Sequence, residues 1–308
     1  MIEPETLALP TIDDVRGAAE RIAPYARRTP VLAARVDGRP LTLKLEHLQI
    51  TGSFKLRGAL NALLAVPPAG RVVTASGGNH GIGVATAAGL LGRPATIYVP
   101  DTVPADKERR IAATGAEVVR AGAVYAEAER AARAHATRHG LPYLPAYDHP
   151  DVVAGQGTVA LEVAEQVPGC DAVVVAVGGG GLVAGTTLAA GGAGRTVVAV
   201  EPSGCACLHA AVAAGEPVDA PVDSIAASAL GATRIGRVPF AVLRAAPPRL
   251  ALVSDAELLA ARDRLWDEFR LAVEPAGAAP FAAWLAGRVP GAHPCLVVCG
   301  ANAPWTPG

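Results

Sequence analysis

The sequence predicts an α/β fold with open, mostly parallel sheets flanked by helices. Along the chain of 308 residues, short runs of β-branched residues alternate with longer Ala- and Leu-rich stretches, which is the pattern of strand, helix, strand units. Several of the short runs are apolar throughout, as strands covered on both faces require. Glycine and proline, 34 and 26 residues, lie scattered between these segments and mark many short turns.

The individual elements follow from these patterns. The predicted strands lie at residues 41–46, 71–75, 95–99, 117–120, 172–177, 196–201 and 295–298. The predicted helices lie at residues 12–23, 57–65, 80–91, 105–114, 125–139, 156–166, 255–270 and 277–286, with a further helix directly after residues 178–181. Because strands and helices alternate, the connections are those of parallel sheets.

Two proline-rich breaks suggest a division into two domains. One break is Pro67-Pro68-Ala69-Gly70 and the other covers residues 141–150. Such breaks interrupt regular structure and often mark domain boundaries. The sequence therefore predicts a small domain at residues 71–147, inserted into a large domain formed by residues 1–70 and 148–308.

Composition indicates a folded protein that does not bind nucleic acid. Apolar residues make up 51% of the chain and charged residues 18%, so a chain of this size can form a substantial core and is too apolar to be disordered. Lys and Arg number 27 against 28 Asp and Glu. The resulting net charge of −1 gives no basic face for a phosphate backbone.

The start of the chain and its cysteines predict a cytoplasmic location. Residues 1–10 carry acidic residues and lack the basic region and apolar stretch of a signal peptide. No uninterrupted apolar run reaches the roughly 18 residues that span a bilayer, so we expect no membrane partner. The cysteines are odd in number, five, and are typical of reduced thiols.

A run of glycines follows a predicted buried strand. Residues 172–177 lead directly into Gly178, Gly179, Gly180 and Gly181, and a helix is expected next. Without Cβ atoms the backbone can approach an anion closely, and successive N–H groups at a helix N-terminus provide donors and positive potential. The loop therefore predicts a site for a phosphate or another anion rather than a merely structural tight turn. Since no G-K-[ST] follows, it is not a P-loop.

The same segment also fits a dinucleotide site. Gly179, Gly181 and Ala184 match G-x-G-x-x-A, and Glu201 ends the next predicted strand, where a dinucleotide-binding protein carries the acid that binds the ribose. This loop alone leaves open a dinucleotide-binding oxidoreductase or a non-catalytic binding protein.

A lysine at a predicted helix start favours a different cofactor. Lys55 directly follows Phe54 and lies among small residues. A helix N-terminus disfavours a cation, and burial against an aromatic ring would lower the lysine pKa further. A neutral amine can bond to an aldehyde, and pyridoxal phosphate carries both an aldehyde and a phosphate. Taken alone, however, a lysine in an early helical turn is usually a solvated surface cation.

A second glycine-rich loop follows the strand predicted at residues 71–75. It reads Ser76-Gly77-Gly78-Asn79-His80 and opens a predicted helix. Its N–H groups, with the Ser76 and Asn79 side chains, suit a substrate carboxylate. An Asn-capped helix after a glycine-rich turn explains the same pattern structurally.

Several motifs together resemble the fold-type II pyridoxal-phosphate enzymes of the threonine/serine dehydratase and serine racemase group. The matching motifs are Ser53-Phe54-Lys55-Leu56-Arg57-Gly58-Ala59, Ser76-Gly77-Gly78-Asn79-His80-Gly81, Gly155-Gln156-Gly157-Thr158, residues 178–182, Glu201-Pro202, Glu274-Pro275-Ala276-Gly277 and Cys299-Gly300-Ala301-Asn302. The resemblance covers nearly the whole chain. It implies two open, twisted α/β domains like those of the tryptophan synthase β subunit, with the cofactor between them.

The resemblance also implies roles around the cofactor. Lys55 would form the Schiff base and then remove the Cα proton. Phe54 would pack against the cofactor ring, and Asn79 would hydrogen-bond its 3′ oxygen. Backbone N–H groups of residues 178–181 and Leu182 would hold its phosphate.

Further roles concern the substrate and the ring nitrogen. Ser76, Gly77, Asn79 and His80 resemble the loop that binds the substrate carboxylate. Cys299 matches the position of a Ser or Cys beside the pyridine nitrogen. A neutral thiol cannot keep that nitrogen protonated as a carboxylate would, which favours loss of a β-leaving group over reprotonation.

The activity that the resemblance implies is that of an ammonia-lyase. It would eliminate water from an L-β-hydroxy amino acid such as threonine or serine, giving a 2-oxo acid and ammonia. The alternatives in the same fold are a serine racemase and a β-replacing synthase. A homodimer or homotetramer is expected, and the chain resembles the catalytic-only type of this group.

Three departures from the family pattern affect these expectations. Serine racemases carry a second Ser at the position of Gly77, so racemisation by that route is not expected. The family's divalent-cation site uses the acid at the position of Glu201 and a later Asp, but Cys207 takes the place of that Asp. The resemblance therefore implies only a weak site for a divalent or monovalent cation. Ser228 stands where a Gly is common in the loop that faces the substrate.

Overall fold

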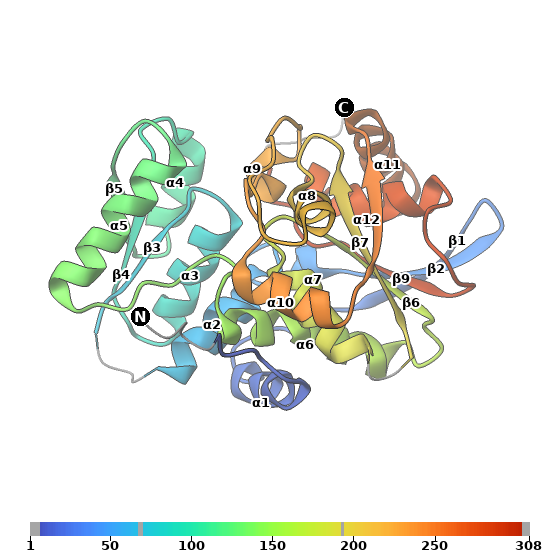
Figure 1. The fold of residues 1–308 in the computed structure, drawn as a ribbon, viewed down its shortest axis with the longest axis horizontal. Coiled ribbons are helices and arrows are strands. Elements are labelled where there is room, and N and C mark those ends of the chain that lie inside the picture. The colour runs from blue at the N-terminus through green and yellow to red at the C-terminus, as the bar shows by residue number, and fades with distance from the viewer. Residues whose placement is uncertain (1–6, 67–69, 192–193, 304–308) are drawn as a thin grey trace.

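The structure, a computed structural model, describes residues 7–66, 70–191 and 194–303. It confirms the predicted α/β class, with strands arranged in a six-stranded and a three-stranded sheet. Figure 1 shows the two sheets in separate parts of the molecule, each with helices beside it. No helix in these described ranges is long and apolar enough to cross a membrane.

The six-stranded sheet has the order β1-β2-β9-β6-β7-β8. Its strands are β1 (Val31–Val36), β2 (Arg39–Lys44), β6 (Ala172–Ala176), β7 (Thr196–Pro202), β8 (Arg249–Val253) and β9 (Pro294–Val297). β1 and β2 pair antiparallel and the other neighbours pair parallel. The central strand β6 is buried along its whole length, as a strand covered on both faces must be.

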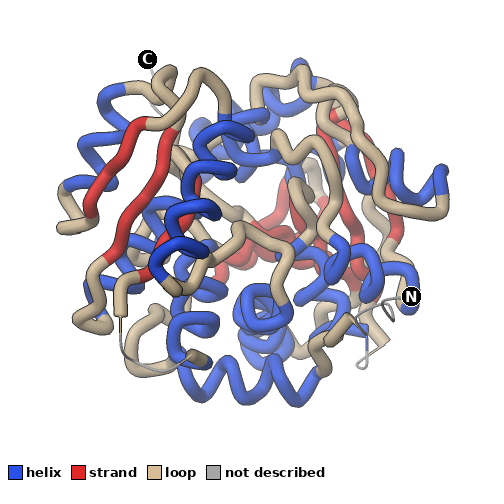
Figure 2. Tube along the Cα trace, turned by 60° about the vertical axis from the view of Figure 1, so that its left-hand side comes forward, coloured by secondary structure: helices blue, strands red, loops and turns tan. Residues whose placement is uncertain are grey.

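The three-stranded sheet is parallel and has the order β3-β4-β5. Its strands are β3 (Val72–Ala75), β4 (Ala95–Val99) and β5 (Glu117–Arg120). Consecutive residues of β3 point to opposite faces of the sheet, since Val72 lies in one apolar cluster and Val73 in another. Helices therefore cover both faces, and Figure 2 shows these strands between helices.

Helices connect the strands in both sheets. They are α1 (Ile12–Ile22), η1 (Glu46–Leu48), α2 (Lys55–Ala65), α3 (Asn79–Leu90), α4 (Ala105–Ala112), α5 (Tyr125–His139), α6 (Pro150–Gln166), α7 (Gly181–Ala190), α8 (Cys207–Ala214), α9 (Ala227–Leu230), α10 (Arg237–Ala245), α11 (Asp255–Phe269) and α12 (Pro275–Leu285). α7 and α12 both pack against β6 and β7. The ends of these strands and helices form the site described below.

The predicted strands are confirmed, but two strands were missed. The β1–β2 hairpin turns at Asp37 and Gly38, which both have positive φ. Asp-Gly is a strong hairpin signal, yet two alanines and Arg35 among the six residues of β1 obscured its strand pattern. β8 is an edge strand whose residues alternate between buried and exposed. The sequence also missed α8, α9 and α10, and α6 begins at Pro150 rather than at residue 156.

The small sheet lies within the range predicted for the small domain, residues 71–147. Its core, however, also includes Leu56 and Leu60 of α2, which pack with Val72 and Ile97. Of the two proline-rich breaks, Pro67 to Ala69 lie outside the described residues. The two-domain division stays a prediction.

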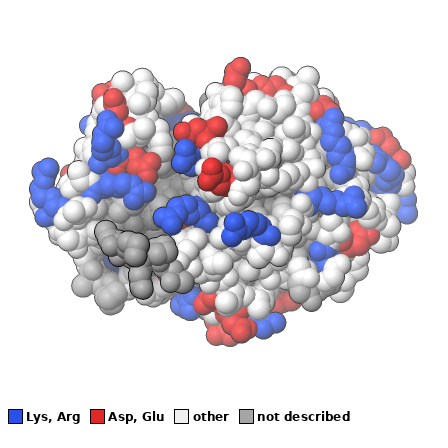
Figure 3. Space-filling model, viewed as in Figure 1, with Lys and Arg blue, Asp and Glu red and all other residues white. Residues whose placement is uncertain are grey.

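Charged side chains do not segregate by sign on the visible surface. On the face shown in Figure 3, basic and acidic side chains are interspersed. This distribution agrees with the net charge of −1, and that face offers no extended basic patch.

Candidate active site

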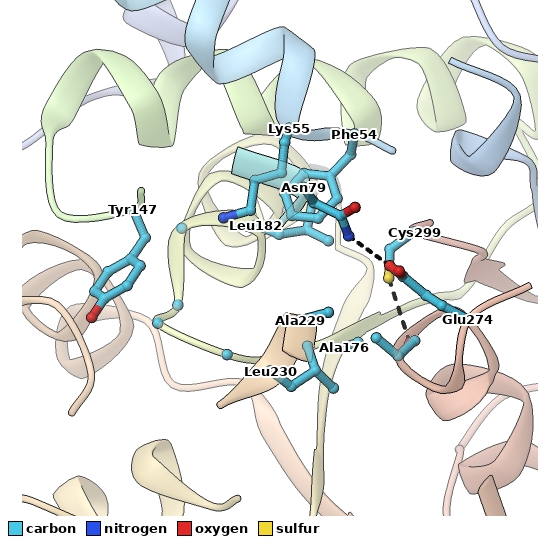
Figure 4. A pocket seen from close by; sticks show the side chains of 15 residues that line it. Phe54, Lys55, Asn79, Tyr147, Ala176, Leu182, Ala229, Leu230, Glu274 and Cys299 are labelled. Atoms are coloured by element: carbon cyan, nitrogen blue, oxygen red, sulfur yellow. Dashed lines mark hydrogen bonds between the residues drawn. The ribbon is translucent and has the colours of Figure 1, made fainter. Parts of the chain in front are cut away.

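One cavity collects residues from segments that adjoin both sheets (Figure 4). It is lined by Phe54, Lys55, Asn79, Tyr147, Ala176, Gly178, Gly179, Gly180, Gly181, Leu182, Ala229, Leu230, Glu274, Ala276 and Cys299. Most of these residues follow the carboxyl ends of β3, β6 and β9 or open the next helix. The carboxyl edge of parallel strands is the usual ligand site of open α/β sheets.

The glycine loop, residues 178–181, forms one wall of the cavity. It joins the end of β6 to α7, whose first residue is Gly181. Gly180 has φ of 94°, a backbone conformation that favours glycine. A Cβ on Gly179 would lie 2.2 Å from Cδ1 of Tyr147, so only glycine fits there.

The start of α7 supplies hydrogen-bond donors to this wall. The first N–H groups of a helix have no partner within it, and no acidic side chain lies in the first turn of α7. Donors and positive helix-end potential therefore face the cavity, which suits a phosphate or another anion.

Lys55 is the first residue of α2, and its amine points into the cavity (Figure 4). Nζ donates a 2.9 Å hydrogen bond to the carbonyl oxygen of Ala146 and lies 5.3 Å from the centre of the Phe54 ring. Burial lowers the pKa of Lys55 to about 8, in the direction that the sequence predicted. At pH 7 about a tenth of the amine is therefore neutral, far more than for an ordinary lysine.

Asn79 and Glu274 form a polar pair in the cavity (Figure 4). Asn79 Nδ2 donates to Glu274 Oε1 at 2.7 Å. Asn302 supports both residues, because its Nδ2 donates to Asn79 Oδ1 at 2.7 Å and its backbone N–H to Glu274 Oε2 at 3.1 Å. Burial raises the pKa of Glu274, and these hydrogen bonds act in the opposite direction.

Cys299 follows β9 and lies beside Glu274. Its thiol is buried and donates to the carbonyl oxygen of Ala276 at 3.4 Å. Burial, followed by the nearby Glu274 carboxyl, raises the pKa of Cys299 well above its ordinary value. The thiol is therefore neutral, as predicted.

A buried ion network supports the first turn of α2. Arg57 is 1% exposed and its guanidinium bonds Glu46 and Glu162, at 2.7 Å each. Burial alone would raise the pKa of Glu46, but Arg57 holds it below its ordinary value. Because η1, α2 and α6 meet at this network, it positions the turn that carries Lys55.

Three residues predicted to bind the substrate lie outside the set that lines this cavity. Ser76 Oγ accepts from the N–H of Gly78 at 3.1 Å. His80 is buried, and its Nε2 lies 2.9 Å from Thr74 Oγ1 and 3.1 Å from the Leu144 carbonyl oxygen. Burial lowers the pKa of His80 to about 3, so its ring is neutral and helps to hold the loop.

Gly77, the third of these residues, faces a packed side chain. A Cβ at this position would lie 2.7 Å from Cγ2 of Val103. Val103 thus fills the space that any larger residue at position 77 would need.

Tyr147 and Glu274 line the cavity but received no role from the sequence. The Tyr147 ring lies against Gly179, and its hydroxyl donates to the Arg234 carbonyl oxygen at 3.3 Å. Burial raises the pKa of Tyr147 to about 12. No sequence motif includes Tyr147, which lies in the connecting segment after α5. Glu274, by contrast, opens the Glu274-Pro275 motif, so a place in the site could have been assigned to it from the sequence.

Glu201 lies at the end of β7, outside this cavity. Its carboxylate is fully buried and accepts the backbone N–H groups of Leu208 at 2.7 Å and His209 at 3.0 Å. The carboxylate is therefore not free to bind a ribose, so the dinucleotide site considered from the sequence lacks its ribose-binding acid. The described residues also contain no group of three or more His, Cys, Asp or Glu side chains placed to bind a metal ion.

Comparison with known proteins assigns the chain to a family. A family profile described as "Pyridoxal-phosphate dependent enzyme" matches residues 22–300. The chain belongs to this family. Pyridoxal phosphate is the cofactor of its members.

Relatives of the pyridoxal-phosphate family match over almost the whole chain. L-threo-3-hydroxyaspartate ammonia-lyase from Pseudomonas sp is 36% identical over 307 residues, covering 96% of each chain. The crystal structure of a threonine deaminase from T.th. matches with a TM-score of 0.91 at 38% identity, covering 97% of this chain and 100% of that chain. Maize serine racemase matches with a TM-score of 0.91 at 32% identity, covering 96% and 94%. The fold is that of fold-type II pyridoxal-phosphate enzymes.

The cavity fits pyridoxal phosphate. The glycine loop provides an anion site, Lys55 an amine for an aldehyde, and Cys299 a neutral thiol at another side of the same cavity. A phosphate requires the close backbone approach that glycine allows. The donor set therefore agrees with the cofactor of the family.

Proposed function

We propose that this pyridoxal-phosphate enzyme is an ammonia-lyase that removes water from an L-β-hydroxy amino acid. The observation that carries this proposal is the placement of the Lys55 amine, the glycine loop and the Cys299 thiol in one cavity. The names of the ammonia-lyase and threonine deaminase relatives support it. Threonine, serine and 3-hydroxyaspartate are the candidate substrates.

When bound, pyridoxal phosphate supplies an aldehyde that bonds amines and a ring that delocalises negative charge from Cα. In this proposal the N–H groups of residues 178–181 and Leu182 would hold the phosphate. Phe54 would pack against the ring, and the Asn79 side chain would hydrogen-bond the ring oxygen. Lys55 would hold the aldehyde before the substrate arrives and would carry the Cα proton afterwards.

The reaction balances as a loss of water. Lys55 Nζ takes the proton from Cα, the Cα electron pair forms the new double bond to Cβ, and the Cβ–O bond breaks. The leaving hydroxyl takes up one proton, which balances the proton that Lys55 removed from Cα, and departs as water. The released unsaturated amine then reacts with water, giving a 2-oxo acid and ammonia.

Cys299 favours elimination. Because its thiol is neutral, it gives the ring nitrogen no carboxylate that would keep it protonated. Charge is then delocalised less strongly, so loss of the β-hydroxyl competes well with reprotonation at Cα.

Serine racemase is the alternative function, and maize serine racemase is among the structural relatives. The Gly77 position argues against it, because Gly77 has no acid to protonate Cα and Val103 fills the adjacent space. The substrate-carboxylate roles of Ser76, Gly77, Asn79 and His80 stay part of the proposal, with backbone N–H groups of the loop as the donors.

The proposal is tested by product analysis on a panel of substrates. Purified holoenzyme is incubated with L-threonine, L-serine and L-threo-3-hydroxyaspartate, and 2-oxo acid and ammonia are quantified. Equal amounts of both products from at least one substrate are expected. Formation of D-serine without 2-oxo acid would reject the lyase in favour of the racemase.

We also propose that the protein is cytoplasmic and forms a homodimer or homotetramer. The cysteines, Cys170, Cys205, Cys207, Cys295 and Cys299, are free and buried, as in a reducing compartment. Leu48 and Ile50 are large apolar side chains that are 43% and 41% exposed, and a subunit contact would cover them. Light scattering coupled to gel filtration measures the assembly.

A further inference from the structure

A second cluster lies behind the glycine loop, at the ends of the neighbouring strands β6 and β7. It consists of Glu201, Cys207 and His209, which we call the α8 hook. Both oxygens of Glu201 are engaged: Oε1 accepts from the Leu208 N–H at 2.7 Å, and Oε2 accepts from the His209 N–H at 3.0 Å and from His209 Nδ1 at 2.5 Å. The β7 end is thus bonded to the first turn of α8.

Cys207 connects this turn to the glycine loop. Its thiol is buried and donates to the carbonyl oxygen of Gly178 at 3.2 Å. Gly178 is the first glycine of the loop that lines the cavity. The α8 hook therefore fixes the outer side of the loop whose inner side faces the cofactor site.

The geometry does not fit the cation that the family resemblance predicted at Glu201. Ca²⁺ takes six to eight oxygen ligands and Mg²⁺ takes oxygen ligands in octahedral geometry, whereas both Glu201 oxygens here accept N–H groups. Cys207, which takes the place of the family's second carboxylate, directs its thiol to Gly178. Within the described residues, no other carboxylate or histidine completes a metal-binding group at this position.

We infer that the α8 hook replaces a bound cation in this chain and holds the glycine loop in its phosphate-binding shape without a metal ion. The N–H donors of α8 and His209 hydrogen-bond the buried Glu201 carboxylate and so fix the position of α8. Cys207, the first residue of α8, then positions Gly178 through its hydrogen bond. A neutral imidazole suffices, because Nδ1–H can donate to the carboxylate. His209 and Cys207 are thus positioning residues, and this inference rests on the proposed function of the glycine loop.

The first test asks whether the protein needs a cation. Wild-type holoenzyme is treated with EDTA and exchanged into a buffer whose only cation is tetramethylammonium. The Kd of pyridoxal phosphate, by fluorescence, and the unfolding midpoint are then compared with and without Mg²⁺, Ca²⁺ or K⁺. We expect the Kd to change by less than about twofold and no shift of the midpoint. A Kd at least about tenfold weaker after chelation, restored by one of these cations, would overturn the inference.

The second test separates positioning from general stability. We expect His209→Ala and Cys207→Ala each to weaken pyridoxal phosphate binding about tenfold, since each removes a partly buried hydrogen bond. His209→Asn and Cys207→Ser keep a donor and should stay within about threefold of wild type. His293→Ala, an exposed histidine beside β9, is the matched control. Unchanged affinity in both alanine variants would contradict the inference.

The two proposals fail in different ways. Wild-type protein that does not bind pyridoxal phosphate would reject the proposed function, and the effect of chelation on the unfolding midpoint would still test the hook. If His209→Ala does not fold, the chelation experiment on wild-type protein decides the question.

Discussion

Asn79 Nδ2 donates a 2.7 Å hydrogen bond to Glu274 Oε1 across a sequence separation of 195 residues. Asn79 opens α3 beside the small sheet, and Glu274 precedes α12 beside the large one. Asn302 bonds to both residues. One side of the cavity is therefore held by contacts between the two sheets.

Replacing Glu274 should disturb this arrangement. Glu274→Ala leaves the Asn79 amide and the Asn302 N–H without their acceptor, and we expect a loss of about 1–3 kcal/mol in the free energy of unfolding. Chemical denaturation of the apoprotein measures this loss. Glu165→Ala, which removes an exposed carboxylate that pairs with Arg28, is the control and should cost less than about 1 kcal/mol.

Glu274 should also give stability a pH dependence. Burial raises its folded pKa above the unfolded value, so its contribution is fully present below the unfolded pKa and falls as pH rises towards the folded pKa. Relative to Glu274→Gln, which does not titrate, wild type should lose stability as pH rises above the ordinary glutamate pKa towards the raised pKa of the folded state. A stability difference that stays constant with pH would contradict the raised pKa.

Loading of the cofactor should depend on the protonation of Lys55. Only the neutral amine attacks an aldehyde, and the pKa of Lys55 is lowered to about 8. The rate of cofactor uptake by apoprotein should therefore rise with pH, with a midpoint near pH 8. Stopped-flow absorbance measures this rate, and a midpoint near the ordinary lysine pKa would show that the amine is solvated.

Covalent attachment identifies the lysine directly. The chain has three lysines, Lys44, Lys55 and Lys107, so borohydride reduction followed by peptide mass spectrometry gives an unambiguous site. Lys55→Ala should abolish incorporation and lower turnover by at least about 10²–10⁴-fold. Lys107→Arg is the control and should retain both, whereas label on Lys107 in wild type would exclude the assigned role.

The buried thiols should be unreactive in the native state. The thiolate is the nucleophile towards alkylating agents, and burial raises the pKa of Cys299. We expect no modification of Cys299 by iodoacetamide in native protein and full modification after unfolding, read by mass spectrometry. Rapid native alkylation of Cys299 would mean that it is ionised and accessible.

Gly179 should not tolerate a side chain while Tyr147 is present. A Cβ would lie 2.2 Å from the Tyr147 ring, and Gly179→Ala should cost about 1–3 kcal/mol and weaken cofactor binding. Gly169→Ala, which has open space around the Cβ position, should be close to neutral. If the clash is the cause, combining Gly179→Ala with Tyr147→Ala should recover cofactor binding. A double variant that binds the cofactor no better than Gly179→Ala would show that the clash with Tyr147 is not the cause.

Gly77 and Val103 should together determine reaction specificity. Gly77→Ser alone clashes with Val103 Cγ2, so we expect it to lower stability by about 1–3 kcal/mol without racemase activity. Gly77→Ser with Val103→Ala makes room for the hydroxyl and should give measurable D-serine from L-serine by chiral chromatography. Val103→Ala alone is the control. Racemisation by wild type at a rate matching elimination would contradict the assignment of the protein as a lyase.

Much of the site could be predicted because its chemistry lies in short segments. Lys55, Asn79, the glycine loop and Cys299 each occur where a strand ends or a helix begins, and the carboxyl ends of parallel strands meet at one edge. The helix that begins at Lys55 was predicted to begin at residue 57, because Phe54 and Lys55 carry no capping signal. The β1–β2 hairpin was missed although Asp37-Gly38 marks its turn.

By itself the sequence determined the α/β class, the approximate strands and the residue types that suit pyridoxal phosphate, since these follow from local periodicity and turn chemistry. Only the tertiary structure decided which distant groups meet: Tyr147 on Gly179, Val103 against Gly77, Glu274 with Asn79, and Glu201 bound by α8 rather than open to a cation or a ribose. Such contacts depend on how the elements pack, and a single sequence carries no local pattern for them.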